Sequence, residues 1–416
     1  MPRRTLFAAL ALAIISLTAP PFSFSGTGTS VRDATGKAAG RPGARTPRAR
    51  PDPLAGVDLG MMVLANGGYG ETLADGRRVF FTLIPDLQRF ADDLLADNEV
   101  PTGAAVVLDA VTGRVLAMAQ HRERPVAHGT PDVALDPSPP VASVFKIVTA
   151  AALLERGLTV NEEACYHGGS HRLYASNLAD APGDTLCASM AAALGHSINA
   201  VFAKLSDRHL TRGAIQAYAE AFGFNRDIPF DVPVPRSKAE IPDDRLERAR
   251  AAAGFWHSSM SPLHAAMIAQ AVANGGAMQR PFIVDRVEDA RGKVLHKGAP
   301  RLMGRSIREG TSRNLLGAMV ETVESGTARK AFRDGRGRPY LPGVSVSGKT
   351  GTLNGSDPFR AYSWFVAAAP AQKPEVAVAV LVVNDSAWRI KAAGAAAQIL
   401  KRYFEKGAAK GKAEKP

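Results

Sequence analysis

Segments typical of β-strands stand at both ends of this 416-residue chain and enclose an alanine-rich middle. Residues 104–119 place two apolar runs around Thr112-Gly113, which predicts a β-hairpin. Residues 361–370 and 375–385 predict two more strands near the other end. Between about residues 145 and 280 the long apolar stripes have helical spacing. This order predicts one α+β domain whose sheet is built from both ends of the chain.

Further segments complete the predicted outline. Residues 76–83 predict a strand, and a helix is expected to begin at Pro85, because proline suits the first helical position. A helix over residues 262–274 should end at Gly275-Gly276. A second hairpin is predicted around Arg291-Gly292, and a closing helix over residues 392–404.

The N-terminal residues have the pattern of an export signal. Arg3 and Arg4 precede an apolar run from Leu6 to Ala19. This run is shorter than the roughly 20 residues of a membrane-spanning helix, and it fits a signal peptide better. We therefore predict that residues 1–25 are a signal peptide or an uncleaved signal anchor. The expected location is the periplasm or the outer face of the cytoplasmic membrane.

Two basic segments are predicted to lie outside the fold. Residues 26–60 are rich in Gly, Pro, Thr and Arg and predict a disordered linker, and residues 406–416 predict a flexible tail. Residues 61–405 would then form the folded domain. Much of the formal net charge of +12 lies in the terminal segments. This charge is either simply solvated, or it gives the protein a weak attraction to anionic membrane or wall polymers. No nucleic-acid motif accompanies it, so no nucleic-acid partner is predicted.

Two cysteines, Cys165 and Cys187, flank a polar, glycine-rich segment. Export would permit a disulfide between them, and two free thiols are the alternative. Nearby His167 and His171 do not complete a recognisable zinc pattern. The sequence thus predicts no metal site, and it carries no cofactor motif.

Ser143 and Lys146 place a hydroxyl and an amine one helical turn apart on an otherwise apolar segment, VASVFKIVTAAALLERG. A serine hydroxyl becomes a good nucleophile only when a base removes its proton. A lysine at a partly dry helix start has a lowered pKa and can supply that base. Alone, the S-x-x-K spacing is weak, because a capping serine beside a snorkelling lysine gives the same pattern.

Two further motifs follow in the order expected of one active site. Ser197-Ile198-Asn199 is either a helix cap or a hydroxyl and an amide serving a substrate. Lys349-Thr350-Gly351-Thr352 is either a strand ending in a turn or a site that recognises a carboxylate, with Gly351 allowing close approach to the backbone. Each motif is weak by itself, but all three in one exported chain are a strong signal.

These motifs resemble those of the transpeptidase domain of penicillin-binding proteins. The resemblance covers about residues 75–405 and includes these segments outside the motifs: 76–95, 104–119, 261–281, 324–331 and 362–370. It implies a mainly antiparallel sheet packed with helices, together with an all-helical subdomain, as in the β-lactamase and transpeptidase fold.

The resemblance also implies an activity: D,D-transpeptidation through an acyl-serine intermediate on the D-Ala-D-Ala end of peptidoglycan stem peptides, with β-lactams as covalent inhibitors. Ser143 would be the nucleophile, Lys146 the base for acylation, and Ser197 a proton relay. Asn199 would bind a substrate amide. The backbone N–H groups of Ser143 and Thr352 would form the oxyanion hole.

The third motif is the carboxylate site that the resemblance implies. Lys349, Thr350 and Thr352 would hold the terminal carboxylate of the substrate, beside Gly351. No cofactor is implied. The expected partners are stem peptides and β-lactams, with possible membrane anchoring, and the sequence identifies no protein partner.

Three alternatives stay open at this point. If water rather than an amine takes the acyl group, the enzyme is a D,D-carboxypeptidase. A serine β-lactamase would need a group that activates water, and Glu162 and Glu163 stand in no recognisable context for that role. A non-catalytic protein that binds β-lactams or wall fragments is the alternative of another class, and it would not need both Ser143 and Lys146.

Overall fold

The computed structural model describes residues 52–124, 132–356 and 359–413, and all of them belong to one compact unit. The predicted signal segment and most of the predicted linker lie outside the described residues. Within the described residues, the fold is of the α+β class that the sequence predicted, with antiparallel sheets and helices packed on them.

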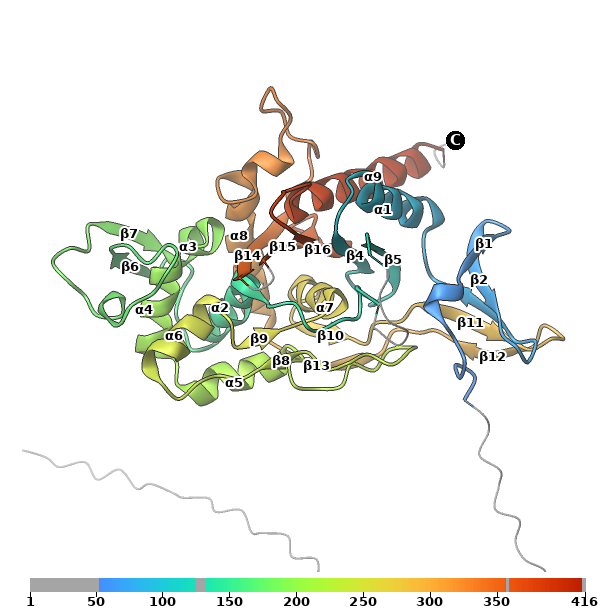
Figure 1. Ribbon diagram of the computed structural model, residues 1–416, viewed down its shortest axis with the longest axis horizontal. Helices are drawn as coiled ribbons and strands as arrows, with labels where there is room; N and C mark the ends of the chain where they lie inside the picture. Colours follow the sequence, from blue (N-terminus) through green and yellow to red (C-terminus); the bar gives the residue numbers. More distant parts are fainter. Residues whose placement is uncertain (1–51, 125–131, 357–358, 414–416) are drawn as a thin grey trace, which may run out of the picture. The chain divides into compact units, whose positions relative to one another are not determined.

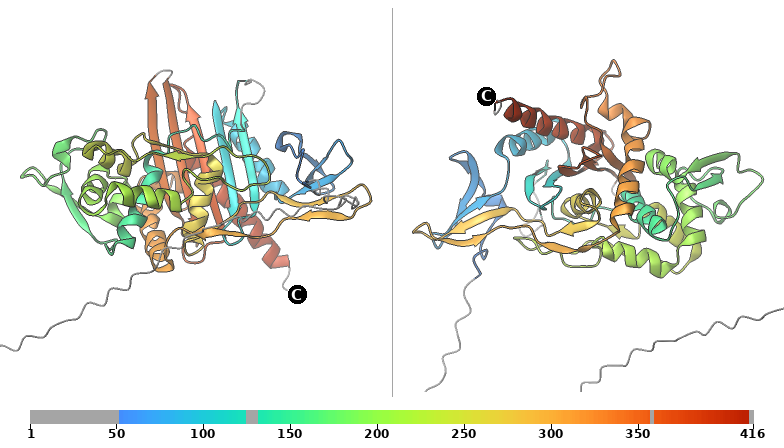
Figure 2. Two further views of the ribbon diagram at one scale, coloured as in Figure 1. Left: turned by 90° about the horizontal axis from the view of Figure 1, so that it is seen from below. Right: turned by 180° about the vertical axis from the view of Figure 1, so that it is seen from behind.

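The largest sheet has five antiparallel strands in the order β14-β15-β16-β4-β5. Its strands come from both ends of the chain, as predicted, and Figure 2 shows them side by side. Their bounds are β4 (Thr102–Asp109), β5 (Val115–Arg122), β14 (Ser347–Ser356), β15 (Phe359–Ala369) and β16 (Val376–Asn384). The predicted hairpin around Thr112-Gly113 is the β4–β5 pair, and Gly113 has the positive φ that a tight turn requires.

Both faces of this sheet are buried, so its central strands are apolar at nearly every position. On β4, Val106 belongs to one hydrophobic cluster and its neighbour Val107 to the other. Helices α1 (Pro85–Asp97) and α9 (Ala392–Ala413) cover one face, and α7 (Pro262–Ala273) covers the other (Figure 1). The sheet therefore forms the middle of three layers, and β14 is the strand at one of its edges.

A second sheet has the order β1-β2-β3-β11-β12. Its strands are β1 (Val63–Ala65), β2 (Gly68–Thr72), β3 (Arg78–Phe81), β11 (Val284–Glu288) and β12 (Val294–Lys297). The predicted strand over residues 76–83 is β3, and the predicted hairpin around Arg291-Gly292 is the β11–β12 pair.

Two strands of this sheet, β1 and β2, were not expected from the sequence. They are joined by Asn66-Gly67, and both residues have positive φ, the conformation of a type I′ hairpin turn. The Asn-Gly pair was the sequence signal for this hairpin. Ordered contacts also begin earlier than the expected linker boundary at residue 60, because Arg77 donates hydrogen bonds to the carbonyl groups of Pro53 and Ala55.

The helical subdomain surrounds α2, which is buried along nearly its whole length. Its neighbours in contact are α3, α4, α5, α6 and α8, which explains why apolar residues cover most faces of α2. The bounds are α2 (Lys146–Glu155), α3 (Met190–His196), α4 (Asn199–His209), α5 (Arg212–Ala221), α6 (Arg245–Ala253) and α8 (Glu309–Glu324).

Short elements complete the described structure. They are η1 (Leu59–Met61), η2 (Ala142–Phe145), β6 (Glu163–Tyr166), η3 (Ala175–Asn177), β7 (Leu186–Ser189), β8 (Lys238–Ala239), β9 (Ser258–Ser259), β10 (Ala277–Gln279), β13 (Leu302–Arg305) and η4 (Arg329–Phe332). The closing helix α9 continues to Ala413, beyond residue 405, where a flexible tail was expected to begin. Among the described residues, no helix has the length and apolar character needed to cross a membrane.

Candidate active site

Ser143 and Lys146 lie at the start of the buried helix α2. Ser143 is part of the 3₁₀ turn η2, and Lys146 is the first residue of α2. Ala142, directly before the serine, is buried with a φ of 53°, a left-handed conformation that is strained for alanine. Lys146 Nζ lies 2.8 Å from Ser143 Oγ, so the spacing seen in the sequence becomes a direct contact.

Lys146 is completely buried, and two further acceptors hold its amine in place. Asn199 Oδ1 lies 2.7 Å from Nζ, and the carbonyl of Ala253 also accepts a hydrogen bond from it. Ala253 ends helix α6, where the last carbonyl groups have no partner within the helix. Its neighbour Ala252 accepts instead from Thr149 Oγ1 of α2. The end of α6 is therefore fixed against α2, and one of its free carbonyls positions the amine of Lys146.

The surroundings of Lys146 favour its neutral form. Burial removes water from the amine, and this is the main reason why its pKa lies well below 10.5. The positive charge of Lys349 lowers the pKa of Lys146 further. A neutral amine in contact with Ser143 Oγ can accept the hydroxyl proton, which is what a general base must do.

Lys349 lies on β14 and is also completely buried. It donates hydrogen bonds to Ser197 Oγ at 3.0 Å and to the Thr350 carbonyl at 2.8 Å. Burial lowers the pKa of Lys349 to about 7. Ser197 ends helix α3 in a left-handed conformation with a φ of 58°, which separates α3 from α4 and turns the chain at this point.

The structure thus brings the three predicted motifs together in one site. The Ser-Ile-Asn motif connects the other two, because Asn199 contacts Lys146 and Ser197 contacts Lys349. Within the described residues, Ser197 Oγ makes no hydrogen bond with Ser143 or Lys146.

The remaining predicted residues lie along β14. Gly351 is buried, and a Cβ atom there would lie 3.1 Å from Val144 and 3.1 Å from Trp364. The close approach that Gly351 allows is therefore made by the protein's own η2 turn, which packs against β14. Thr352 is exposed and faces the cleft in front of Ser143. Thr350 Oγ1 lies 2.6 Å from Thr327 Oγ1.

A cleft of about 840 Å³ opens in front of Ser143, a volume suited to a small-molecule or peptide ligand. Asn199 and Thr352 also line it, whereas the two buried lysines lie beneath its surface. The rest of its wall comes from residues 170–173, from α6 and the residues that follow it (Glu247, Arg250 and 253–257), and from Leu353 and Asn354 of β14.

The sequence model of the penicillin binding protein transpeptidase domain matches residues 103–405. This chain belongs to that family. Its relatives include the peptidoglycan D,D-transpeptidase PbpA of Mycobacterium tuberculosis, which is 30% identical over an alignment of 375 residues that covers 79% of this chain and 73% of the relative.

Solved structures of penicillin-binding proteins share the fold. The D,D-transpeptidase domain of a peptidoglycan glycosyltransferase from Eggerthella lenta superposes with a TM-score of 0.68 at 27% identity, covering 83% of this chain and 89% of that one. A ceftriaxone acyl-enzyme complex of penicillin-binding protein A from M. tuberculosis has a TM-score of 0.64 at 25% identity, covering 81% and 80% of the two chains.

Two kinds of site residue in this penicillin-binding transpeptidase domain were not predicted from the sequence. The carbonyl groups of Ala253 and Ser170 contact Lys146 and Asn199, and a backbone carbonyl has no signature in a sequence. Thr327 contacts Thr350, and its segment, ESGTARKA, was a weak signal, because it lies shortly before the Lys-Thr-Gly motif.

The two cysteines of this family member form a disulfide between β6 and β7. Cys165 and Cys187 are directly opposite each other in the antiparallel pair. The segment between them includes Ser170, whose carbonyl accepts a hydrogen bond of 2.8 Å from Asn199 Nδ2. The disulfide therefore closes a loop that reaches the active site.

Proposed function

We propose that this chain is a peptidoglycan D,D-transpeptidase that acts through an acyl-serine intermediate on stem peptides ending in D-Ala-D-Ala. The observation that carries the proposal is the contact of a buried amine, Lys146, with both Ser143 Oγ and Asn199 Oδ1. Family membership and the peptidoglycan D,D-transpeptidase named among the relatives support the substrate class.

In the acylation step, Ser143 Oγ attacks the carbonyl carbon of the penultimate D-alanine, and Lys146 takes the hydroxyl proton. The backbone N–H groups of Ser143 and Thr352 stabilise the oxyanion that forms. When the peptide bond breaks, the terminal D-alanine leaves with a proton on its amine. Ser197 relays this proton, and its contact with Lys349 supports that role by fixing the hydroxyl.

The lysine of β14 is the group suited to recognise the substrate carboxylate. Lys349 lies at the buried end of the site with a pKa of about 7, and a bound carboxylate would stabilise its charged form. Thr350 and Thr352 supply hydroxyl donors beside it on the same strand. Asn199 binds the substrate amide while it holds Lys146 in place.

The second half of the reaction transfers the acyl group from Ser143 to an amine of another stem peptide. If water took the acyl group instead, the product would be that of a D,D-carboxypeptidase. The cleft favours slow hydrolysis, because Glu247, the carboxylate in its wall, already interacts with Arg250 and His257. Glu162 and Glu163 are not among the residues of the cleft wall.

Fluorescent penicillin tests the proposal directly. Wild-type protein should form a stable adduct that is lost in Ser143→Ala. Rapid release of the label with turnover would identify a β-lactamase, and absence of labelling would leave only a non-catalytic binder. A synthetic peptide ending in D-Ala-D-Ala, offered with and without an amine acceptor, separates transpeptidation from carboxypeptidase action by the product formed.

We further infer that the domain works outside the cytoplasm, with residues 1–25 as its signal peptide or anchor and with a linker between this segment and the first ordered contacts at Pro53. The disulfide supports an oxidising location. Fractionation of an epitope-tagged protein tests this inference, because a cleaved protein is released in the periplasm whereas an anchored one stays with the membrane.

A further inference from the structure

The disulfide-closed loop, residues 165–187, forms part of the active-site cleft. Its residues 170–173 line the cleft together with residues of β14. The carbonyl of Ser170 accepts a hydrogen bond from Asn199 Nδ2, and the carbonyl of Leu173 accepts from Arg250 of α6. The position of this loop therefore bears directly on Asn199.

Lys204 is a completely buried amine that the proposed mechanism does not use. It lies on α4, five residues after Asn199, or about 7.5 Å further along the helix axis. Its three donors all point to the disulfide-closed loop. They reach the Cys165 carbonyl at 2.8 Å, Asp180 at 3.3 Å, and Asp184 in a short ion pair.

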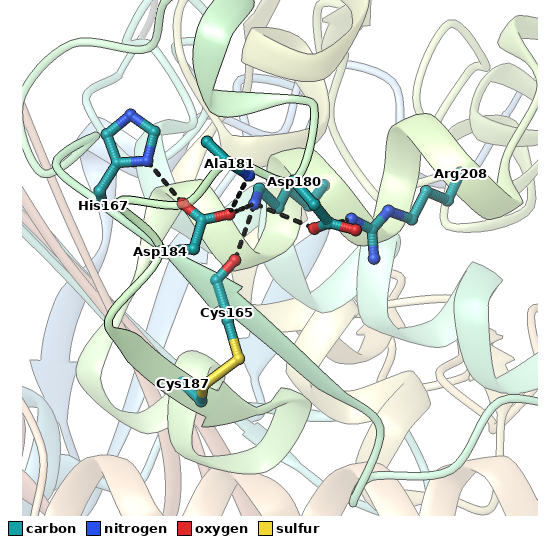
Figure 3. The surroundings of a disulfide bond; sticks show 8 residues. Cys165, His167, Asp180, Ala181, Asp184, Cys187 and Arg208 are labelled. Atoms are coloured by element: carbon teal, nitrogen blue, oxygen red, sulfur yellow. Dashed lines mark hydrogen bonds and ion pairs between the residues drawn. A yellow bond between two sulfur atoms is a disulfide. The ribbon is translucent and has the colours of Figure 1, made fainter.

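Figure 3 shows this cluster to one side of the disulfide, next to the carbonyl of Cys165. Asp184 also interacts with His167 Nδ1 at 2.5 Å and accepts a hydrogen bond of 3.0 Å from the Ala181 amide. Hydrogen bonds from Lys204 and His167 hold the pKa of Asp184 well below its usual range, so the carboxylate stays charged. The hydrogen bonds of Lys204 tie both arms of the loop, at Cys165 and at Asp184, to α4.

The contact between the loop and α4 is tight at the cleft end as well. A Cβ atom on Gly169 would lie 2.9 Å from Ala200, so the loop backbone packs directly on the first turn of α4. Within the loop, Asn177 is buried and its Nδ2 donates to the His167 carbonyl at 2.9 Å. These contacts brace the loop on α4 both at its Lys204 end and close to Ser170.

The Ser170 carbonyl decides which way the Asn199 amide faces. An amide has a donor end and an acceptor end, and only the acceptor end suits Lys146. With Nδ2 donating to Ser170, Oδ1 is directed to Lys146 at 2.7 Å. If Ser170 moved away, the amide would lose this constraint, and the amine of Lys146 would lose a fixed partner.

We propose that Lys204 is a positioning residue for acylation of Ser143: by clamping the disulfide-closed loop to α4, it fixes the Ser170 carbonyl that orients Asn199. The proposal rests on the proposed function, since it concerns the rate of that same acylation. It assigns to Lys204 a purpose beyond stability, which well-packed apolar residues in place of the whole Lys204–Asp184 pair could supply as well.

The test is the acylation kinetics of Lys204→Met, with fluorescent penicillin and the full-length protein, well below its melting temperature. Methionine keeps the volume and removes the three donors. The amplitude of labelling measures how many molecules are folded and competent. The rate constant at saturating penicillin measures how fast Ser143 is acylated in each of those molecules, and so depends on the geometry of the site. We expect full amplitude with a rate constant at least ten-fold lower than wild type.

Arg208→Met is the matched control, because Arg208 lies on the same helix and bonds to Asp180 of the same loop, but in an exposed pair. Its rate constant should stay within two-fold of wild type, since exposed pairs contribute little. A rate constant for Lys204→Met within two-fold of wild type would overturn the proposal, whatever the amplitude. A purely structural role would lower only the amplitude.

A second variant decides the matter if Lys204→Met does not fold. Asp184→Asn keeps the shape and an acceptor for Lys204 but loses the charge of the ion pair, and its rate constant should fall at least three-fold. An unchanged rate constant in a folded Asp184→Asn would overturn the proposal. Failure of the proposed function looks different, because wild-type protein itself would then form no adduct at Ser143.

Discussion

Lys349 donates a hydrogen bond of 3.0 Å to Ser197 Oγ, so the second and third motifs meet beneath the surface of the cleft. Lys146 makes the other connection, between Ser143 and Asn199. Two buried lysines thus share one site with different partners. Lys146, beside Ser143, is suited to accept a proton, and Lys349, on β14, is suited to bind a negatively charged carboxylate.

Replacing Lys146 should separate activity from stability. In Lys146→Met the nucleophile has no base, and we expect labelling by fluorescent penicillin to slow by at least about 100-fold. The melting temperature should stay the same or rise, because a buried amine that loses hydration is replaced by an apolar chain. Acylation near the wild-type rate would show that Lys146 is not the base.

Gly254 should be intolerant of any side chain. It ends α6 with a φ of 87°, and a Cβ atom there would lie 2.2 Å from the carbonyl oxygen of Ala142. Gly254→Ala should therefore displace the turn that carries Ser143, lower the free energy of unfolding by at least about 2 kcal/mol and slow acylation. Urea unfolding and penicillin labelling measure the two effects.

The control is Gly335→Ala, where nothing lies within 4 Å of the added atom. This variant should match wild type in both measurements. Equal behaviour of the two alanine variants would contradict the close packing at Gly254.

Lys349 should make stability depend on pH above neutrality. Its pKa is about 7 in the folded protein and about 10.4 in an unfolded chain, so between these values the unfolded state binds more protons. The free energy of unfolding of wild type, relative to Lys349→Met, should rise with pH from about 7 to 10 by up to about 1.4 kcal/mol per pH unit. Below about pH 7 the difference should be constant.

Denaturant unfolding of both proteins at several pH values measures this difference. A difference that is flat across the range, or that falls with rising pH, would mean that Lys349 keeps its charge in the folded state.

The disulfide should stabilise the fold by about 3 kcal/mol, since it closes a loop with a sequence separation of 22 residues. The double variant Cys165→Ala/Cys187→Ala should lose that amount in urea unfolding. Because Cys187 is exposed, dithiothreitol should lower the stability of wild type and leave the double variant unchanged. A wild-type stability that is insensitive to the reductant, with the thiols shown to be free, would contradict the estimate.

Much of the architecture was readable from the chain because its signals are local. The hairpin at Thr112-Gly113 and the helix beginning at Pro85 follow from turn chemistry and periodicity, and the structure has both. The hairpin at Asn66-Gly67, which was not predicted, has an equally local signal, because an Asn-Gly pair favours a type I′ turn. The end of α9 beyond residue 405 had no sequence signal strong enough to predict it, because the alanines and lysines there are compatible with both a helix and a flexible tail.

The sequence by itself determined which side chains this site contains, because Ser143, Lys146, Ser197, Asn199 and Lys349 stand in short motifs whose order is informative. Only the tertiary structure decided what each one touches. The carbonyl groups of Ala253 and Ser170 that hold the site together belong to the backbone, and their positions depend on where a helix ends and how a loop is clamped. Such contacts join residues far apart in the chain, so packing rather than local pattern sets the geometry of the site.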